Sequence, residues 1–226
     1  MTDTPLGPEV DATPRPLPVR QAIRGRTVVL EPLHPRHIDD LWAAAQGADD
    51  SWAYLAYGPF PNRDALARQI ATMAAEHDPM VWAVRPVATG VVAGWMALLD
   101  IQPRNAAVEL GHIWLSPALQ RTETATEAMF LLLRLAAEDL GYRRLVWKCN
   151  ALNAPSRRAA ARLGFTYDGT LRAHMVVKGR ERDTAMFSII APEWPAVRDA
   201  LVAWLDPGNF DATGAQKAGL AALRAG

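Results

Sequence analysis

Cysteine and long hydrophobic runs are the first things that this 226-residue sequence lacks. Its one cysteine, Cys149, excludes an internal disulfide framework and is typical of a reducing compartment. We interpret Cys149 as a buried strand residue, with an acyl-carrying nucleophile as the alternative. The apolar run Ala128–Leu133 is far shorter than the roughly 20 residues of a membrane span, and the acidic, proline-rich N-terminus shows no signal region. We therefore expect a cytoplasmic protein.

The sequence also has no excess of charge of either sign. Lys plus Arg and Asp plus Glu each number 24, so no global basic field favours nucleic acid or a membrane surface as a partner. Half of the residues are hydrophobic, which is enough for one domain with a substantial core. We see no repeats and no second domain, and we expect no metal.

Proline marks the start of the chain, and strand and helix patterns follow. Residues 1–20 contain five prolines and predict an extended arm, disordered or lying on a partner subunit. Strands are predicted at 27–30, 81–87, 91–101, 106–115 and 143–151, and a hairpin at 165–177 and 182–190. Helices are predicted from Pro35, after Asn62, and at 122–140, 153–163 and 193–205, with a weak one at 215–224.

The stretch from Val108 to Met129 organises the rest. It reads as a strand that stops at Pro117, a polar turn around Gln120, and a helix whose first turns carry Glu123 and Glu127. A strand that leads directly into a helix start leaves several backbone N–H groups unpaired, at the end where the helix dipole favours negative charge. The pattern therefore predicts an anion-binding cradle.

Several motifs in order then indicate a family. The sequence resembles the GNAT N-acetyltransferases, most closely their RimJ/RimL-like branch. The motifs that carry the resemblance are, in order, ELG.IWLSP with Q and ATEA, LGYRRL, NAPS with RLGF, G.LR, and RD with FSI. The resemblance covers about residues 24–195 and leaves 196–226 as the end of a helix and a tail. It implies a mixed α/β (α+β) fold: a twisted, mostly antiparallel sheet with a central parallel βαβ unit and helices on both faces.

The resemblance further implies that the cradle holds the pyrophosphate of acetyl-coenzyme A. The family pattern Gln/Arg-x-x-Gly-x-Gly/Ala stands here as Gln120-Arg-Thr-Glu-Thr-Ala125, with Arg121 and Glu123 where many relatives carry glycine. Arg121 could compensate through charge-assisted hydrogen bonds, and Glu123 must then point away from the phosphates. The expected cofactor-binding residues are Ile113, Trp114, Leu115, Gln120, Arg121, Thr122, Glu123, Thr124, Ala125, Thr126, Asn153 and Ser156.

Three catalytic candidates follow from the chemistry of acyl transfer and from the resemblance. Glu109 is the first choice as base, because the related branch places a carboxylate there, and a structural ion pair is the alternative. His112 is the second choice, but strict alternation puts it on the opposite face of the strand from Glu109 unless the strand bulges. The tyrosine that many relatives use near the thiolate corresponds to Ala160. The resemblance to the RimJ/RimL-like branch instead implies Asn153 and Ser156, with the serine as hydrogen-bond donor near the sulfur; helix capping is the alternative for both.

The acceptor side has weaker signals. Trp52, Tyr54, Tyr57 and Phe60 lie in a loop that could line a pocket or cover a small core. The resemblance places this loop and the last hairpin beside the acceptor, where Arg172 could bind a carboxylate, although a solvated hairpin explains its charges equally well.

These observations favour an enzyme that moves an acetyl group from acetyl-coenzyme A to a primary amine by direct attack in a ternary complex. The amine could belong to a protein N-terminus, an amino acid or another small molecule. Two alternatives stay open: succinyl-coenzyme A or another acyl donor, which would require a cationic group beside the thioester, and a non-catalytic module that binds coenzyme A. A homodimer is reasonable.

Overall fold

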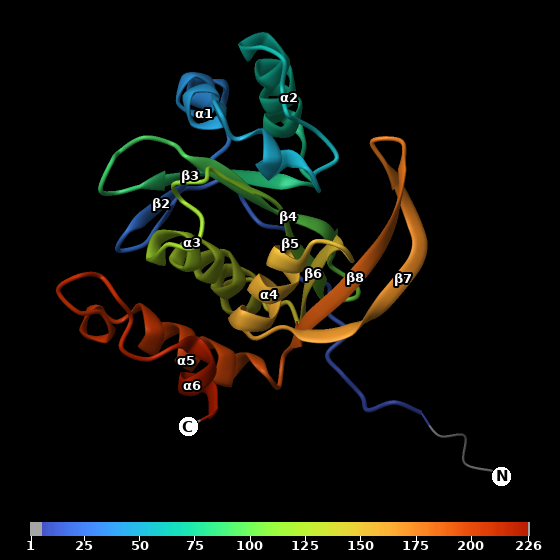
Figure 1. Ribbon diagram of the computed structural model, residues 1–226. Helices are drawn as coiled ribbons and strands as arrows, with labels where there is room; N and C mark the ends of the chain where they lie inside the picture. Colours follow the sequence, from blue (N-terminus) through green and yellow to red (C-terminus); the bar gives the residue numbers. More distant parts are fainter. Residues whose placement is uncertain (1–5, 226) are drawn as a thin grey trace.

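The computed structural model describes residues 6–225, and these fold around one eight-stranded sheet (Figure 1). The strand order is β1-β2-β3-β4-β5-β6-β8-β7, and every neighbouring pair is antiparallel except β5 and β6. Helix α3 connects this parallel pair, which forms the predicted βαβ unit. The predicted mixed α/β fold is therefore confirmed.

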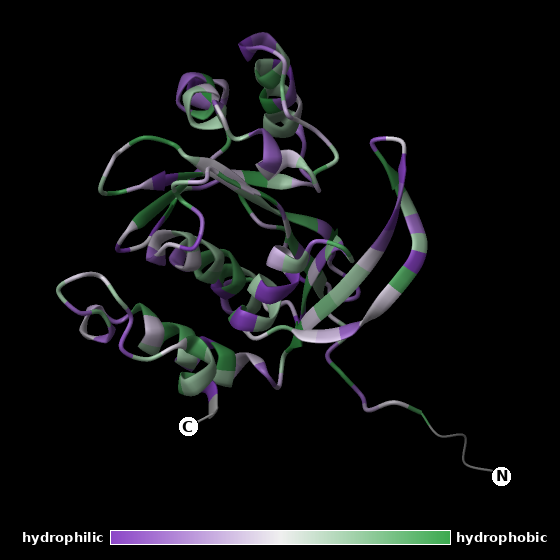
Figure 2. Ribbon diagram, viewed as in Figure 1, coloured by the Kyte–Doolittle hydropathy of each residue, from purple (hydrophilic) through white to green (hydrophobic). Residues whose placement is uncertain are grey.

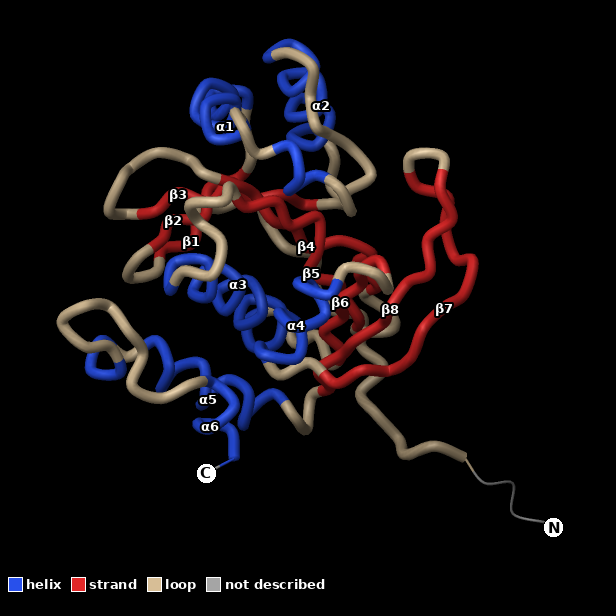
Figure 3. Tube along the Cα trace, in the orientation of Figure 1, coloured by secondary structure: helices blue, strands red, loops and turns tan. Residues whose placement is uncertain are grey.

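The strands lie close to their predicted positions, except for the short β1, which was not predicted. They are β1 (Ile23–Arg24), β2 (Val28–Pro32), β3 (Met80–Pro86), β4 (Gly94–Gln102), β5 (Ala107–Leu115), β6 (Arg144–Asn150), β7 (Thr166–Val177) and β8 (Arg180–Ile190). Figure 3 shows that the hairpin of β7 and β8 extends beyond the other strands, with its turn on the side of α1 and α2.

The longer helices are α1 (Ile38–Ala45), α2 (Arg63–Ala75), α3 (Glu123–Arg134), α4 (Ala154–Leu163), α5 (Trp194–Leu205) and α6 (Leu220–Ala225). Short turns are η1 (Pro35–His37), η2 (Asp49–Trp52) and η4 (Pro207–Asn209), and η3 (Leu135–Asp139) continues α3 as a π-helix. Within residues 6–225, no helix combines the length and the apolar character that crossing a bilayer requires.

Two hydrophobic cores lie on opposite faces of the sheet. The larger core packs α3, α4 and α5 against the sheet, and the smaller core packs α1, α2 and the aromatic loop against the other face. Figure 2 shows hydrophobic residues between the sheet and the helices and hydrophilic residues at the turn of the β7–β8 hairpin. Side chains that alternate along one strand therefore enter different cores.

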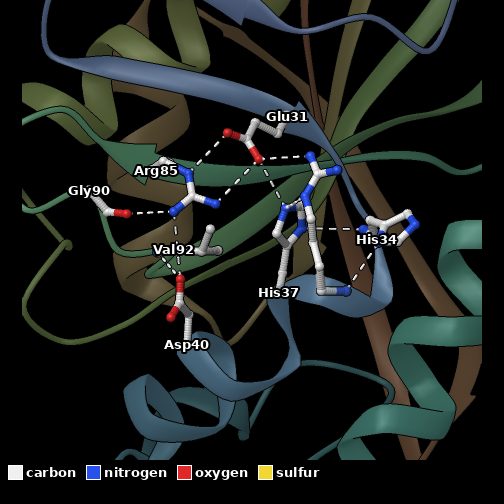
Figure 4. Close-up of polar contacts among 8 residues, drawn as sticks. Glu31, His34, His37, Asp40, Arg85, Gly90 and Val92 are labelled. Carbon is white, nitrogen blue, oxygen red and sulfur yellow. Dashed lines mark hydrogen bonds and ion pairs between the residues drawn. The ribbon is translucent and has the colours of Figure 1, made fainter.

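A polar cluster at the edge of the smaller core holds α1 against β2 and β3 (Figure 4). Glu31 on β2 accepts hydrogen bonds from Arg85 (3.0 Å) and Arg36 (3.1 Å), and its Oε2 lies 3.0 Å from Nε2 of the buried His37. The hydrogen bond from Arg85, with smaller contributions from Arg36 and His37, lowers the pKa of Glu31 to about 2. Glu31, Arg36, His37 and Arg85 thus bond to one another, and these bonds stabilise the packing of α1 against the sheet.

Segments near both ends of the described chain contact the rest of the domain. The backbone N–H of Arg15 donates to the carbonyl of Pro103 (3.0 Å), and Tyr142 donates its hydroxyl to the carbonyl of Pro16 (3.2 Å). At the other end, Arg224 donates to the carbonyls of Arg162 and Ala161 at the end of α4. Residues 1–5 of the predicted arm lie outside the described residues.

Candidate active site

Strands β5 and β6 separate beyond Glu109. Their parallel register pairs Ala107 with Arg144, Val108 with Leu145 and Glu109 with Val146, and no later pair forms within the described residues. Beyond this point β5 continues to Leu115 beside β4, while β6 continues to Asn150 beside β8. The separation leaves one backbone edge of residues 110–115 without a strand partner in residues 6–225, so an extended ligand could pair there.

A bulge in β5 brings Glu109 and His112 to the same face of the sheet. His112 has a φ of +49°, and the register with β4 shifts between the pairs Trp95–Trp114 and Ala97–Gly111. Leu110 packs in the larger core, whereas Trp114 packs in the smaller one, which strict alternation would not allow. The bulge that the two candidate bases need in order to share one face of the sheet is therefore present.

Glu109 is buried and paired. Its Oε2 lies 3.0 Å from Nζ of Lys148 on β6, and the same Nζ lies 2.7 Å from Asp100 on β4. Burial raises the pKa of Glu109, and the positive charge of Lys148 opposes that rise. A carboxylate whose pKa is moved toward neutrality can accept a proton from an ammonium more readily than an exposed one.

His112 contacts the aromatic loop. Its Nδ1 lies 3.5 Å from the hydroxyl of Tyr57, which accepts a hydrogen bond from Nε1 of Trp95 at 3.2 Å. Burial lowers the pKa of His112, and the carboxylates of Glu76 and Asp78 oppose this. Burial also raises the pKa of Tyr57 to about 12, so its hydroxyl keeps its proton at neutral pH.

The predicted cradle has its backbone donors available. Arg121 adopts a φ of +61°, so the turn takes a left-handed conformation without the glycine that relatives carry. The N–H groups of residues 121–124 have no acceptor within residues 6–225. Thr122 caps α3 by accepting from Ala125 N (3.1 Å), and Gln120 donates its side-chain amide to the carbonyl of Leu115 (2.9 Å). Four open donors at a helix start suit a phosphate group.

The two glutamates of α3 are held by the β1–β2 turn. Glu123 forms an ion pair with Arg26, which directs its carboxylate toward that turn. Glu127 is buried and accepts from the backbone N–H of Arg26 (2.6 Å) and of Thr27 (2.7 Å). Both side chains therefore have structural partners.

The start of α4 lies beside β6. Asn153 caps the helix by accepting from Ser156 N (3.1 Å), so Asn153, and not Ser156, is the cap. The hydroxyl of Ser156 instead accepts a hydrogen bond from Nε1 of Trp147 (3.0 Å). That bond occupies an acceptor position and leaves the hydroxyl proton to be donated. Burial raises the pKa of the Cys149 thiol, and a hydrogen bond from Ser156 opposes this rise.

The residues of the aromatic loop have two roles. Some pack in the smaller core, and others form hydrogen bonds with neighbouring segments. Trp52 is buried and stacks on Trp114 with a centroid distance of 4.3 Å, so both rings belong to the smaller core. Tyr54 is exposed and donates to the carbonyl of Leu152 (3.1 Å). Lys178, at the turn of the β7–β8 hairpin, donates to the carbonyl of Trp52 (2.9 Å).

Three further residues of the predicted site are Arg172, Ala125 and Thr126. Arg172 is exposed on β7, where the register with β8 is interrupted. Ala125 and Thr126 are buried in the first turns of α3, and Arg162 of α4 donates to the hydroxyl of Thr126 (3.2 Å). Residues 6–225 contain no group of three or more His, Cys, Asp or Glu side chains arranged to bind a metal ion.

Lys148 and Arg182 were not singled out from the sequence, although the first had a signal. Lys148 is the charged residue inside the otherwise apolar segment Leu145–Cys149, and a charge in a central strand needs a partner. Arg182 follows closely after the hairpin turn in the sequence, but its Nε is buried. No local pattern predicts that a strand will carry it back toward the sheet centre.

The sequence matches the model of one family. The Acetyltransferase (GNAT) domain matches residues 27–166, which is 140 of 226 residues. A GCN5-related N-acetyltransferase structure from Brucella melitensis is 44% identical, with a TM-score of 0.92, and the match covers 94% of this chain and 98% of that one.

Two further relatives are more distant. The structure of a probable acetyltransferase of the GNAT family from Chromobacterium violaceum is 40% identical, with a TM-score of 0.78 over 85% of this chain and 100% of that one. The Bacillus subtilis protein YdaF, whose name gives ribosomal N-acetyltransferase as a provisional activity, is 27% identical over 105 residues. This match spans 46% of the chain and 57% of the length of that relative.

Proposed function

Since this chain belongs to the GNAT acetyltransferase family and is an enzyme of acyl transfer, we propose that it moves an acetyl group from acetyl-coenzyme A to a primary amine. The observation that carries the proposal is the placement of the buried Glu109 at the point where β5 and β6 separate. The open donors of residues 121–124 lie at the start of the helix that follows the same strand. One strand thus links a phosphate-binding turn to a proton acceptor.

The turn and the open strand edge would hold the donor. The backbone N–H groups of residues 121–124 would bind the pyrophosphate, with the exposed Arg121 adding positive charge. The unpaired edge of residues 113–115 would bind the pantetheine amides as an added strand would. This pairing directs the thioester into the separation between β5 and β6.

Glu109 would then accept the proton of the acceptor ammonium, directly or through a water molecule. The neutral amine attacks the thioester carbonyl carbon, the new C–N bond forms, and the C–S bond breaks; the nitrogen loses its second proton and the leaving thiolate gains one, which gives the amide and the coenzyme A thiol. Free N–H groups of β5 would stabilise the oxyanion, and the Ser156 hydroxyl is the candidate donor to the thiolate. His112, with its pKa lowered by burial, is a second acceptor for the ammonium proton.

The RimJ/RimL-like assignment and a cytoplasmic location are parts of the same proposal. The provisional activity named for YdaF supports a protein N-terminus as one acceptor class, next to amino acids and other small amines. The motif order quoted above supports the branch, and the single buried cysteine supports a reducing compartment.

The test is the release of free thiol from acetyl-coenzyme A with a panel of primary amines. Wild-type protein should release thiol with at least one amine, and Glu109→Gln should lower kcat by about 10²- to 10⁴-fold at neutral pH, as the loss of a general base does. The dissociation constant for acetyl-coenzyme A should stay within about twofold.

Thermal shift with coenzyme A and its acyl derivatives separates donor binding from catalysis. Absence of stabilisation by any of them would contradict the proposal. Stabilisation without thiol release for any amine would favour a non-catalytic binding module. Full activity of Glu109→Gln across the pH range would remove Glu109 from the mechanism and leave His112 as the base.

A further inference from the structure

Arg182 on β8 is an inward-facing arginine without a partner. Its Nε–H is buried and makes no hydrogen bond, and its guanidinium forms no ion pair within residues 6–225. The neighbouring carboxylate of Asp183 is occupied, because it accepts from the backbone N–H of Ala173 at 2.7 Å. A buried guanidinium donor left unsatisfied is costly, so a missing acceptor is the simplest explanation.

The strand register places Arg182 on the face of the sheet that carries Lys148 and Glu109. Thr184 pairs with Asn150, and Met186 pairs with Lys148, so these side chains and that of Arg182 share one face of the sheet. Lys148 reaches Glu109 on this same face. Burial raises the pKa of Glu109, and the positive charge of Arg182, after that of Lys148, acts against the rise. Arg182 therefore lies within electrostatic range of the candidate base.

Two other arginines of the sheet have carboxylate partners, by contrast. Arg85 on β3 binds Glu31, and Arg144 on β6 binds Asp168. Lys148, on the same face of the sheet, already binds Glu109 and Asp100. Arg182 differs from these residues because its buried Nε–H has no acceptor within the described residues. Its planar fork of donors fits a carboxylate bidentately.

We propose that Arg182 binds a carboxylate of a reactant held beside Glu109. The inference rests on the proposed acyl transfer and specifies its reactants. The carboxylate can belong to the acceptor, as in a free α-amino acid, or to the acyl chain of a donor such as succinyl-coenzyme A. In either case Arg182 selects for a negative charge close to the reacting carbonyl.

Two hydrogen bonds link the segments that surround the β7–β8 hairpin turn. Lys178 joins the hairpin turn to the carbonyl of Trp52, and Tyr54 joins the same loop to the carbonyl of Leu152. These contacts connect the β7–β8 hairpin, the aromatic loop and the β6–α4 turn. The two bonds therefore hold these three segments together beside the hairpin turn.

The experiment compares reactants that differ only in the carboxylate. Alanine and alaninamide are the acceptors with acetyl-coenzyme A, and alaninamide is also tested with succinyl-coenzyme A. The variants are Arg182→Met, Arg182→Lys as a conservative change, and Arg180→Met as a control that removes an exposed arginine two residues closer to the turn.

For the reactant that bears the carboxylate, Arg182→Met should lower kcat/KM by about ten- to hundredfold, mostly through KM, because one charge-assisted hydrogen-bonded contact is lost. Arg182→Lys should recover part of the loss, and Arg180→Met should have little effect. A loss with alanine identifies the acceptor as the source of the carboxylate, and a loss with succinyl-coenzyme A identifies the donor.

A second measurement keeps the inference independent of turnover. Alanine is titrated calorimetrically into wild-type protein and Arg182→Met, both saturated with coenzyme A, and succinyl-coenzyme A affinity is compared with that of acetyl-coenzyme A. Arg182-dependent binding without thiol release would sustain the carboxylate site while the proposed function fails. Equal losses with alaninamide and acetyl-coenzyme A, no loss with either carboxylate, or no carboxylate binding at all would overturn the site.

Discussion

Lys148 joins Glu109 to Asp100 across three strands. Its Nζ lies 3.0 Å from Glu109 on β5 and 2.7 Å from Asp100 on β4, and Lys148 itself stands on β6. The ion pair with Glu109 crosses the place where β5 and β6 begin to separate. The lysine therefore fixes the orientation of the candidate base and adjusts its affinity for a proton.

Removing the lysine should move the pH dependence in a defined direction. Burial raises the pKa of Glu109, and Lys148 lowers it, so Lys148→Met should raise this pKa further. A base must be deprotonated to act, so the acidic limb of the kcat/KM profile should shift to higher pH. Asp100→Asn is the matched control: it removes a negative charge that raises the pKa of Glu109, and its limb should move to lower pH. Limbs that do not move would exclude Glu109 as the titrating group.

Arg121 offers a test of backbone strain in the cradle. Its φ of +61° costs a residue with a Cβ about 1 kcal/mol relative to glycine. Arg121→Gly and Arg121→Ala both remove the guanidinium, but the glycine variant should be more stable by about 1 kcal/mol in urea unfolding. If Arg121 compensates for lost glycines by binding phosphate, both variants should bind acetyl-coenzyme A equally weakly. Equal stabilities would show that the turn relaxes.

Ser156 and Asn153 can be separated by substitution. Asn153→Ala removes the cap of α4 and should destabilise the fold by about 1 kcal/mol with little effect on turnover by bound reactants. Ser156→Ala leaves Nε1 of Trp147 without its acceptor, which should cost about 1–3 kcal/mol. Chemical unfolding with single-turnover rates measures both effects. A tenfold fall in the single-turnover rate of Ser156→Ala alone would support a role at the thiolate, and an unchanged rate would leave only the structural role.

The lowered pKa of Glu31 implies that the free energy of unfolding depends on pH in the acidic range. Its pKa of about 2, held low chiefly by the hydrogen bond from Arg85, lies below the ordinary value of 4.5. The ionised carboxylate therefore contributes stability above pH 4.5, at most about 3 kcal/mol, and this is lost as the pH falls toward 2. Glu31→Gln should destabilise the protein at pH 7, with a smaller difference at pH 3. Asp39→Asn, which breaks the exposed pair with Arg63, should change stability by less than about 0.5 kcal/mol throughout.

Local patterns predicted the elements well because each one has a local cause. Asn62 and Thr122 accept hydrogen bonds from backbone N–H groups three residues later, and Gly164 ends α4 with a φ of +104°. The local sequence is therefore enough to locate these helix ends. The helix predicted to run to Leu140 changes instead to a π-helix after Arg134. That change depends on how the end of α3 packs, which no short pattern records.

The site was predictable only in part for a related reason. The motif order pointed to the turn at Gln120 and to Glu109 as candidates. The bulge was recognised as a condition but could not be deduced, because a single residue at a φ of +49° follows from contacts on both faces. Lys148 and Arg182 come together with Glu109 through pairing among β5, β6 and β8, which are far apart in sequence. The sequence left open whether Trp52 lines a pocket or packs in a core, and its stacking on Trp114 places it in the core.

The single cysteine has a practical consequence for enzymology. Cys149 is buried on β6, and burial raises the pKa of its thiol, so thiolate is scarce at neutral pH. A colorimetric disulfide reagent added to the native protein during turnover should therefore react with coenzyme A while sparing the polypeptide. Continuous assays can then follow product formation without a protein blank that drifts, and full labelling of the polypeptide should require denaturant.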